Sequence, residues 1–246
     1  MYNFFIKNTA LSDGICRIGG NDYNHIKNVL RMKPGEKFLV SCDGKSNLCK
    51  LLSFENDVCL AEIIQKDYQD TNLKAKVVLF QGLPKSDKME LIIQKAVELG
   101  VDEIIPVQMA RCIVSYDAKK IKSKTERFNG IAESAAKQSK RTSIPVVHEV
   151  ASFSRALEIA KSLDLFLIPY ENEQGMASTT EALSNIKENS TIGIMIGPEG
   201  GFEPSEIKKA IEVGGKTISL GKRILRTETA SITAMAMVML YCEANL

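Results

Sequence analysis

The spacing of apolar and polar positions changes near residue 75 of the chain. Before that point, short runs at residues 37–41, 48–54 and 58–64 alternate apolar and polar side chains and are separated by turn residues. Asp43-Gly44 between two such runs is typical of a β-hairpin. The pattern predicts a small, mostly β domain over residues 1–70, and the polar stretch at 67–74 is expected to link it to the rest.

From residue 76 onward, strand-like apolar runs alternate with amphipathic helices. The expected strands are 76–81, 103–107, 144–147, 164–168, 191–196 and 217–220, and the expected helices are 87–99, 122–139, 153–162, 204–213 and 229–243. Asp87 and Glu90 have the spacing of a capping box, and Gly100 suits the end of the first helix. Such alternation predicts an α/β domain at residues 75–246, with a mostly parallel sheet covered by helices on both faces.

Composition excludes several classes of protein. The 246 residues are 44% hydrophobic and 25% charged, which is ordinary for a globular chain. No apolar run approaches the roughly 18 residues of a membrane span, and the first residues lack the pattern of a secretory signal. Six cysteines without a C-x-x-C pair, together with two histidines, argue against a metal site. We therefore expect a cytoplasmic protein.

The net charge of +2 hides an uneven distribution of charge. Residues 1–70 hold nine basic and nine acidic side chains, whereas residues 111–141 hold nine basic and three acidic ones. A local surplus of that size suits a polyanion such as RNA. Taken alone, such a segment is more often a solvated helix face, so its interpretation depends on motifs elsewhere.

Two glycine-containing turns follow predicted strands, at residues 197–201 and 220–227. In parallel α/β sheets, ligands bind beyond the carboxyl ends of the strands, and glycine lets the backbone approach a ligand closely. Neither turn fits a phosphate-binding P-loop or a dinucleotide fingerprint. A single glycine is best explained by a tight turn, but the pair favours a binding site for a ligand that is not a polyphosphate.

These turns and several other runs resemble the 16S ribosomal RNA (uracil-N3)-methyltransferase family of the SPOUT, or trefoil-knot, class. The other matching runs are residues 82–90, 94–101, Arg111-Cys112, 133–139 with Arg141, and His25 with 29–31. They occur in the family's order over nearly the whole chain. One departure is Asn3, because the family often has an arginine just before the first aromatic residues.

The resemblance implies a fold, a cofactor and a reaction. It implies a PUA-like RNA-binding barrel for residues 1–70 and a knotted methyltransferase domain for 75–246. It also implies a homodimer that uses S-adenosylmethionine to methylate N3 of a uridine in the decoding region of 16S rRNA. The cofactor-binding residues would be Leu167, Ile168, Pro169, Gly197, Pro198, Glu199, Gly200, Gly201, Leu220, Gly221, Ile224, Leu225 and Thr227.

Arg226 is the candidate catalytic residue. It precedes a helix that Thr227 or Thr229 is expected to cap, and a cation there opposes the helix dipole by up to about 1 kcal/mol. Local conflicts of this kind concentrate at functional sites. Loss of the uridine N3 proton places negative charge on O2 and O4, which Arg226 could stabilise. An ion pair between Arg226 and Glu199 or Glu228 is the structural alternative.

The base that would accept this proton is not assigned. Glu199 and Glu228 are candidates by position, but capping or ion pairing explains each carboxylate equally well.

RNA contacts are expected from the basic segment and from the β domain. Candidates are Arg111, Gln138 and Arg141, because arginine grips phosphate and amides read unstacked bases. His25 and Arg31 form a second basic spot, although a lone histidine is more often structural.

The last predicted helix bears on assembly, since residues 229–243 are apolar nearly all round and must be buried on more than one side. The resemblance favours a homodimer through this helix, whereas burial within one chain is the alternative.

Rival functions are a related SPOUT enzyme for another rRNA or tRNA position and a non-catalytic RNA-binding assembly factor. A nucleotide-dependent oxidoreductase is disfavoured because no dinucleotide fingerprint follows the first α/β-type strand.

Overall fold

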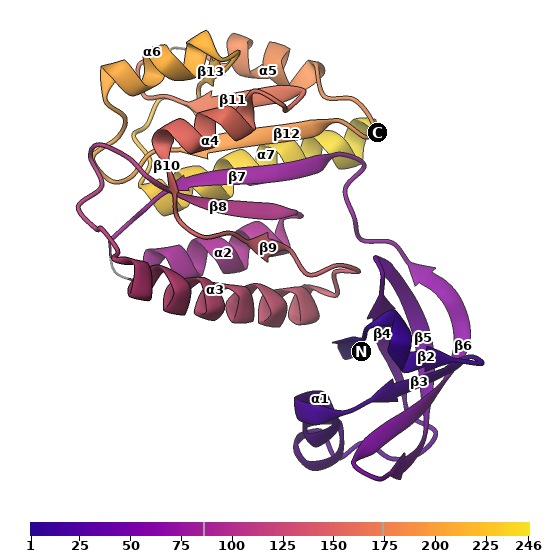
Figure 1. Cartoon of the computed structure of the whole chain (residues 1–246). Helices are drawn as coiled ribbons and strands as arrows, with labels where there is room; N and C mark the ends of the chain where they lie inside the picture. Colours follow the sequence, from indigo (N-terminus) through magenta and orange to yellow (C-terminus); the bar gives the residue numbers. More distant parts are fainter. Residues whose placement is uncertain (86, 174) are drawn as a thin grey trace. The chain divides into compact units, whose positions relative to one another are not determined.

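The computed structural model describes residues 1–85, 87–173 and 175–246 (Figure 1). The chain forms two compact units. The first comprises Met1–Asn72 with Ala136–Ile144, and the second comprises Leu73–Ala135 with Pro145–Leu246. Ser86, part of one of the matched sequence runs, lies outside the described residues.

The first unit is a curled sheet with the strand order β1-β4-β5-β6-β3-β2. Its strands are β1 (Asn3–Phe5), β2 (Leu11–Ser12), β3 (Ile15–Ile18), β4 (Lys37–Cys42), β5 (Lys45–Glu55) and β6 (Val58–Gln69). Short helical segments are η1 (Asn8–Ala10), α1 (Gly20–Asn24) and the π-helical turn η2 (His25–Val29). Alternate residues of the long strands face inward, so Phe38, Val40 and Cys49 meet Phe4 in one core.

Asn3 is a structural residue of this unit. Its side-chain amide donates to the Arg141 carbonyl (2.9 Å) and accepts from the Ser41 hydroxyl (3.0 Å). Because Asn3 is buried, its position is fixed by these contacts. The departure from the family pattern therefore places a neutral, satisfied side chain where an arginine is more common.

The second unit is built on an all-parallel sheet of order β10-β8-β7-β12-β11-β13, with β9 beside β8. Its strands are β7 (Lys76–Gly82), β8 (Glu103–Gln108), β9 (Val146–Val147), β10 (Ala151–Ser152), β11 (Leu165–Pro169), β12 (Thr191–Ile196) and β13 (Lys216–Ile218). The helices are α2 (Lys88–Glu98), α3 (Ala118–Ser139), α4 (Phe153–Ala160), α5 (Ala177–Ser184), α6 (Pro204–Glu212) and α7 (Thr227–Asn245).

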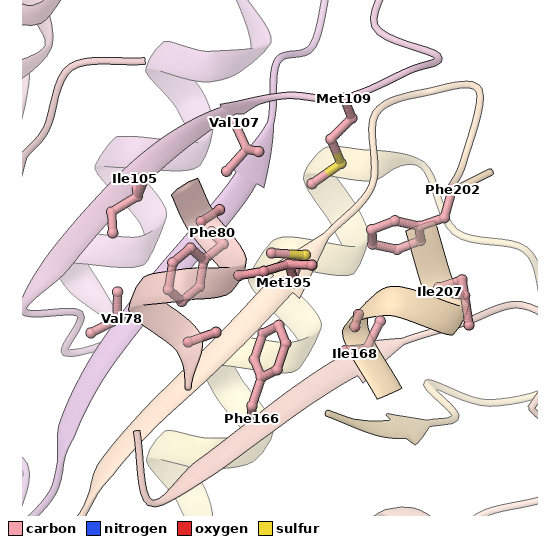
Figure 2. Packing of buried hydrophobic residues seen from close by; sticks show 14 residues of the cluster. Val78, Phe80, Ile105, Val107, Met109, Phe166, Ile168, Met195, Phe202 and Ile207 are labelled. Atoms are coloured by element: carbon pink, nitrogen blue, oxygen red, sulfur yellow. The ribbon is translucent and has the colours of Figure 1, made fainter. Parts of the chain in front are cut away.

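Helices cover both faces of this sheet because its strands are apolar on both sides. On one face, Phe80, Phe166 and Met195 pack with residues of α4 and α6. The Phe80 and Phe166 rings meet edge to face, with centroids 5.9 Å apart, and Figure 2 shows Met195 beside them. On the other face, α7 lies against β12 and α2 (Figure 1). The strands thus point their carboxyl ends toward one edge.

Several local predictions are wrong for tertiary reasons. Asp87 begins α2 without a side-chain cap, since the Glu90 carboxylate binds Arg127 of α3 (2.8 Å). Strand β6 runs to Gln69, into the predicted linker, and α3 begins at Ala118 rather than at 122. Helix α5 was not predicted from the sequence.

Candidate cofactor and catalytic site

A cavity of about 420 Å³ opens at the carboxyl ends of the parallel strands. Its walls come from the turns that follow β11, β12 and β13 and from the first turns of α2 and α7. The lining residues are Lys88, Pro169, Tyr170, Glu171, Glu173, Ile196, Gly197, Pro198, Glu199, Gly201, Phe202, Ser219, Leu220, Gly221, Lys222, Arg223, Ile224, Leu225, Arg226, Thr227 and Ala230. The volume lies within the range of about 300–1,000 Å³ typical of small-molecule sites.

Close backbone packing sets the floor of the cavity. A Cβ atom on Gly82 would lie 2.7 Å from the backbone nitrogen of Pro198, so only glycine allows the end of β7 to approach the turn after β12. Gly221 has a φ of +107°, a backbone conformation that favours glycine. These two glycines are therefore required by the geometry of the turns.

A buried polar network joins β7, the turn after β12 and the start of α7. Gln81 Nε2 donates to Thr227 Oγ1 (3.0 Å), which in turn donates to the Gly197 carbonyl (2.7 Å). The Ser231 hydroxyl donates to Gln81 Oε1 (2.5 Å). Because Gln81, Thr227 and Ser231 are all buried, these bonds hold the turn rigidly beneath the cavity.

Arg226, not Thr227 or Thr229, is the N-cap residue of α7. Its backbone is extended (φ −66°, ψ 153°), and Thr227 is the first helical residue, with its hydroxyl used in the buried network. The Arg226 side chain is exposed at the cavity and forms no ion pair with a described residue. The guanidinium is therefore available to a bound anion.

Both carboxylates that could have paired with Arg226 bind Lys88 instead. Lys88 Nζ lies 3.0 Å from Glu199 Oε1 and 3.3 Å from Glu228 Oε2. The hydrogen bond to Glu199 raises the pKa of Lys88 above its ordinary value. Partial burial opposes ionisation of Glu199, but hydrogen bonds from Lys88 and from backbone N–H groups outweigh it and hold the Glu199 pKa below its ordinary value. Glu199 is thus a weak proton acceptor.

Most of the residues expected at the cofactor site line the cavity, but three do not. Leu167 and Ile168 are fully buried in the sheet. Gly200 faces away, where a Cβ atom would lie 3.0 Å from Arg111 Cβ. Sequence reasoning missed Lys88, Tyr170 and the acidic pair Glu171 and Glu173, among others. Tyr170 and Glu171 lie two and three residues after the predicted strand at 164–168, and Lys88 lies in a run that resembles the family. Both signals could have indicated these residues.

Arg111 braces the turn after β12. Its Nε donates to Glu203 Oε1 (3.1 Å), and its Nη1 donates to the Gly200 carbonyl (3.1 Å). Glu206, at the start of α6, accepts from the Ala110 amide (2.9 Å) and forms a capping box with Glu203. Arg111 therefore has an internal role that its sequence context did not reveal.

The other candidate RNA contacts belong to the first unit and differ in exposure. His25, Arg31 and Gln138 are exposed, and His25 meets the Phe4 ring edge to face. Arg141 is only 3% exposed, and its carbonyl accepts from Asn3. Because so little of Arg141 is accessible to an RNA phosphate, the structure does not support the predicted phosphate contact.

Two further properties concern the described residues only. Within them, no helix is both long and apolar enough to cross a membrane. In the same part of the chain, no group of three or more histidine, cysteine or acidic side chains is arranged to hold a metal ion.

Comparison with known proteins agrees with this architecture. An RNA methyltransferase domain model matches residues 71–239, and an RNA methyltransferase PUA domain model matches residues 18–64. The chain is 40% identical to ribosomal RNA small subunit methyltransferase E of Bacillus subtilis, covering 90% of this chain and 88% of that protein. The protein of the same name from Mesomycoplasma hyopneumoniae is 36% identical, covering 94% and 96%.

Solved structures agree as well. A ribosomal RNA small subunit methyltransferase E from Neisseria gonorrhoeae, bound to S-adenosyl methionine, superimposes with a TM-score of 0.83 at 33% identity, covering 98% of this chain and 97% of that one. The predicted fold class, a small curled β domain with a parallel α/β domain, is confirmed. Fold and site together define an RNA methyltransferase. The chain belongs to the ribosomal RNA small subunit methyltransferase E family.

Proposed function

We propose that the protein is a cytoplasmic enzyme that transfers a methyl group from S-adenosylmethionine to N3 of a uridine in 16S rRNA. Family membership supports the reaction class, and the similar structure from Neisseria gonorrhoeae is bound to this cofactor. The observation that carries the proposal is the cavity at the carboxyl edge of the sheet, lined by the exposed Arg226, which forms no ion pair within the described part of the chain.

The residues of the cavity fit this cofactor. S-adenosylmethionine carries a carboxylate as well as ammonium and sulfonium cations. The walls accordingly offer charges of both signs, with Lys222 and Arg223 on one turn and Glu171 and Glu173 on another. When bound, the cofactor supplies an electrophilic methyl group. The backbone groups of the Gly197 and Gly221 turns would hold it, since glycine permits close approach.

The chain's own contribution to catalysis is charge stabilisation. As N3 of the uridine loses its proton, negative charge develops on O2 and O4. Arg226 would donate to one of these oxygens. Because no carboxylate among the described residues pairs with it, its guanidinium N–H groups are available for this contact. Glu199 has Lys88 as its partner, so we assign it no role as a base.

A direct test uses purified protein, small ribosomal subunits isolated from a strain lacking the corresponding gene, and isotopically labelled S-adenosylmethionine. Nuclease digestion and mass spectrometry should detect labelled 3-methyluridine from a single 16S rRNA position. Label in another nucleoside, or in tRNA, would favour a related enzyme of the class. Binding of rRNA without any transfer would favour an assembly factor.

RNA binding is expected to depend on the exposed lysines near the start of α3, where Lys119 and Lys120 both face solvent. Replacing both with glutamine should reduce the slope of log K against log salt by roughly one unit per lost phosphate contact. Filter binding of 16S rRNA over a salt series measures this slope. Lys208 and Lys209 of α6, also adjacent and exposed, form the matched control pair. Equal slopes for both variants would mean that the α3 face is merely solvated.

We also propose a homodimer packed through α7. One face of this helix, including Ala234, Met235 and Val238, is buried in the unit, but the apolar residues Ala236 and Leu240 on the opposite side are not. Leu240 on that side is 65% exposed, and Ala236 lies one turn before it. A two-fold contact would place this face against its copy.

Introducing glutamate at both Ala236 and Leu240 should convert a dimer of about twice 27.1 kDa into monomers without methylation activity. Light scattering of the purified protein measures the mass. Ile211→Glu on α6 is the control, because Ile211 is also an exposed apolar helix residue. A wild-type protein that is a fully active monomer would contradict the proposed assembly.

A further inference from the structure

Lys88 lies where three distant segments of the second unit meet. It is the first residue of α2, and its ammonium group binds Glu199 in the turn after β12 and Glu228 in the first turn of α7. Only 28% of the Lys88 side chain and 15% of the Glu228 side chain are exposed. The ion pairs are therefore better shielded from solvent than ordinary surface pairs, which contribute little.

Glu199 is connected a second time to the loop before α2, since its Oε1 also accepts from the Lys85 amide (3.0 Å). The preceding residue of the same turn, Pro198, packs closely against Gly82 at the end of β7. The cavity-lining residues Gly197, Pro198 and Gly201 thus belong to a turn whose one charged side chain points back at Lys88.

We propose that Lys88 is a positioning residue for the methyl-transfer reaction, which holds the Gly197–Gly201 turn in the shape that the cofactor requires by binding Glu199 and Glu228 at once. This inference rests on the proposed function. It assigns Lys88 no contact with the reacting atoms. The residue acts through Glu199: by binding this carboxylate, it fixes the position of the cofactor-binding turn.

The charges explain why the lysine matters. Glu199 and Glu228 approach the same ammonium group, so each carboxylate is near the other. Without Lys88, two like charges would face one another in a partly buried place, where they repel strongly. The turn would move outward to separate them, and the walls of the cavity would move with it.

The experiment compares Lys88→Met with the wild-type protein by calorimetric titration with S-adenosylhomocysteine and by steady-state kinetics. We expect the Kd for this ligand and the KM for S-adenosylmethionine to rise about tenfold, within the usual range for coupled neighbours. The kcat at saturating cofactor should fall less than threefold. Lys88→Arg keeps the charge and should restore at least half of the lost affinity.

Lys95→Met is the matched control, because Lys95 lies on the same helix and forms an ion pair with Glu98 (2.8 Å) away from the cavity. Its Kd should remain at the wild-type value. A double variant tests whether Lys88 acts through Glu199. In a protein that already carries Glu199→Gln, adding Lys88→Met should change the Kd less than threefold, since the partner through which Lys88 acts is gone.

The possible outcomes separate the two proposals. If wild-type protein binds S-adenosylhomocysteine but Lys88→Met binds it equally well, the positioning role is overturned and the proposed function stands. If the methionine variant does not fold, an arginine variant with no better affinity than Glu199→Gln would overturn the role as well. A wild-type protein that does not bind the ligand overturns both.

Discussion

Replacing Arg226 with alanine is expected to lower kcat for rRNA methylation by about 10²–10³-fold, the usual loss for one donor to a developing anion. The affinity for S-adenosylhomocysteine should change less than threefold, because the transition-state charge arises on the uridine. Single-turnover kinetics with saturating cofactor and rRNA measures the chemical step.

The same Arg226→Ala substitution should leave the fold at least as stable. Arg226 caps the positive end of the α7 dipole without an ion pair to a described residue, so its removal should stabilise the helix by a few tenths of a kcal/mol. Thermal unfolding measures this change. Arg155→Ala on α4, which breaks an exposed pair with Glu158, is the control for loss of an arginine elsewhere. A variant of Arg226 that retains wild-type kcat would remove this residue from the mechanism.

Alanine at Gly82 should abolish measurable cofactor binding. The added methyl group would lie 2.7 Å from Pro198 N and 3.0 Å from Gly197 C, and backbone atoms cannot swing aside. The turn after β12 must therefore move, and the part of the cavity wall that this turn forms moves with it. Calorimetric titration with S-adenosylhomocysteine measures the loss of binding.

Gly130→Ala is the control for Gly82→Ala, and Gly221→Val is a second test of the same site. At Gly130 of α3 an alanine Cβ would meet nothing within 4 Å, and alanine there should stabilise the helix by about 0.5–1 kcal/mol. At Gly221 the space is also open, but the φ of +107° strains any other residue. Gly221→Val should thus weaken cofactor binding while the core, far from this turn, stays folded. Wild-type affinity in both Gly82→Ala and Gly221→Val would refute the cavity as the cofactor site.

Local sequence pattern was sufficient for elements whose burial is uniform. Strand β12 was predicted at residues 191–196 and is observed as Thr191–Ile196, because a run of β-branched and apolar residues in the centre of a parallel sheet needs no other context. Helix α5 was missed, since its residues Ala177–Ser184 have little amphipathic pattern and few buried side chains. Its anchor is the buried Thr179 hydroxyl, which donates to the Ser219 carbonyl (2.8 Å).

The sequence indicated the two glycine turns and Arg226, all of which line the cavity. The partners of its charged residues were not, because they come from remote parts of the chain. Glu90 had the spacing of a capping residue but binds Arg127, 37 residues away. Arg141 has the sequence context of an RNA contact but lies in the core of its unit. Nothing in local spacing distinguishes these cases, and only the packed structure does.

The contact between Gln81 and Thr227 joins residues 146 positions apart, and this separation has a consequence for synthesis. A ribosome produces the chain from the N-terminus, so β7 and β12 exist before α7 has been made. Until Thr227–Asn245 emerges, Gln81 has no hydroxyl to bind and the Gly197 carbonyl has no donor. The nascent protein therefore acquires its ligand-binding cavity only after this helix has been made, and a chain released before that point would be unable to hold the cofactor.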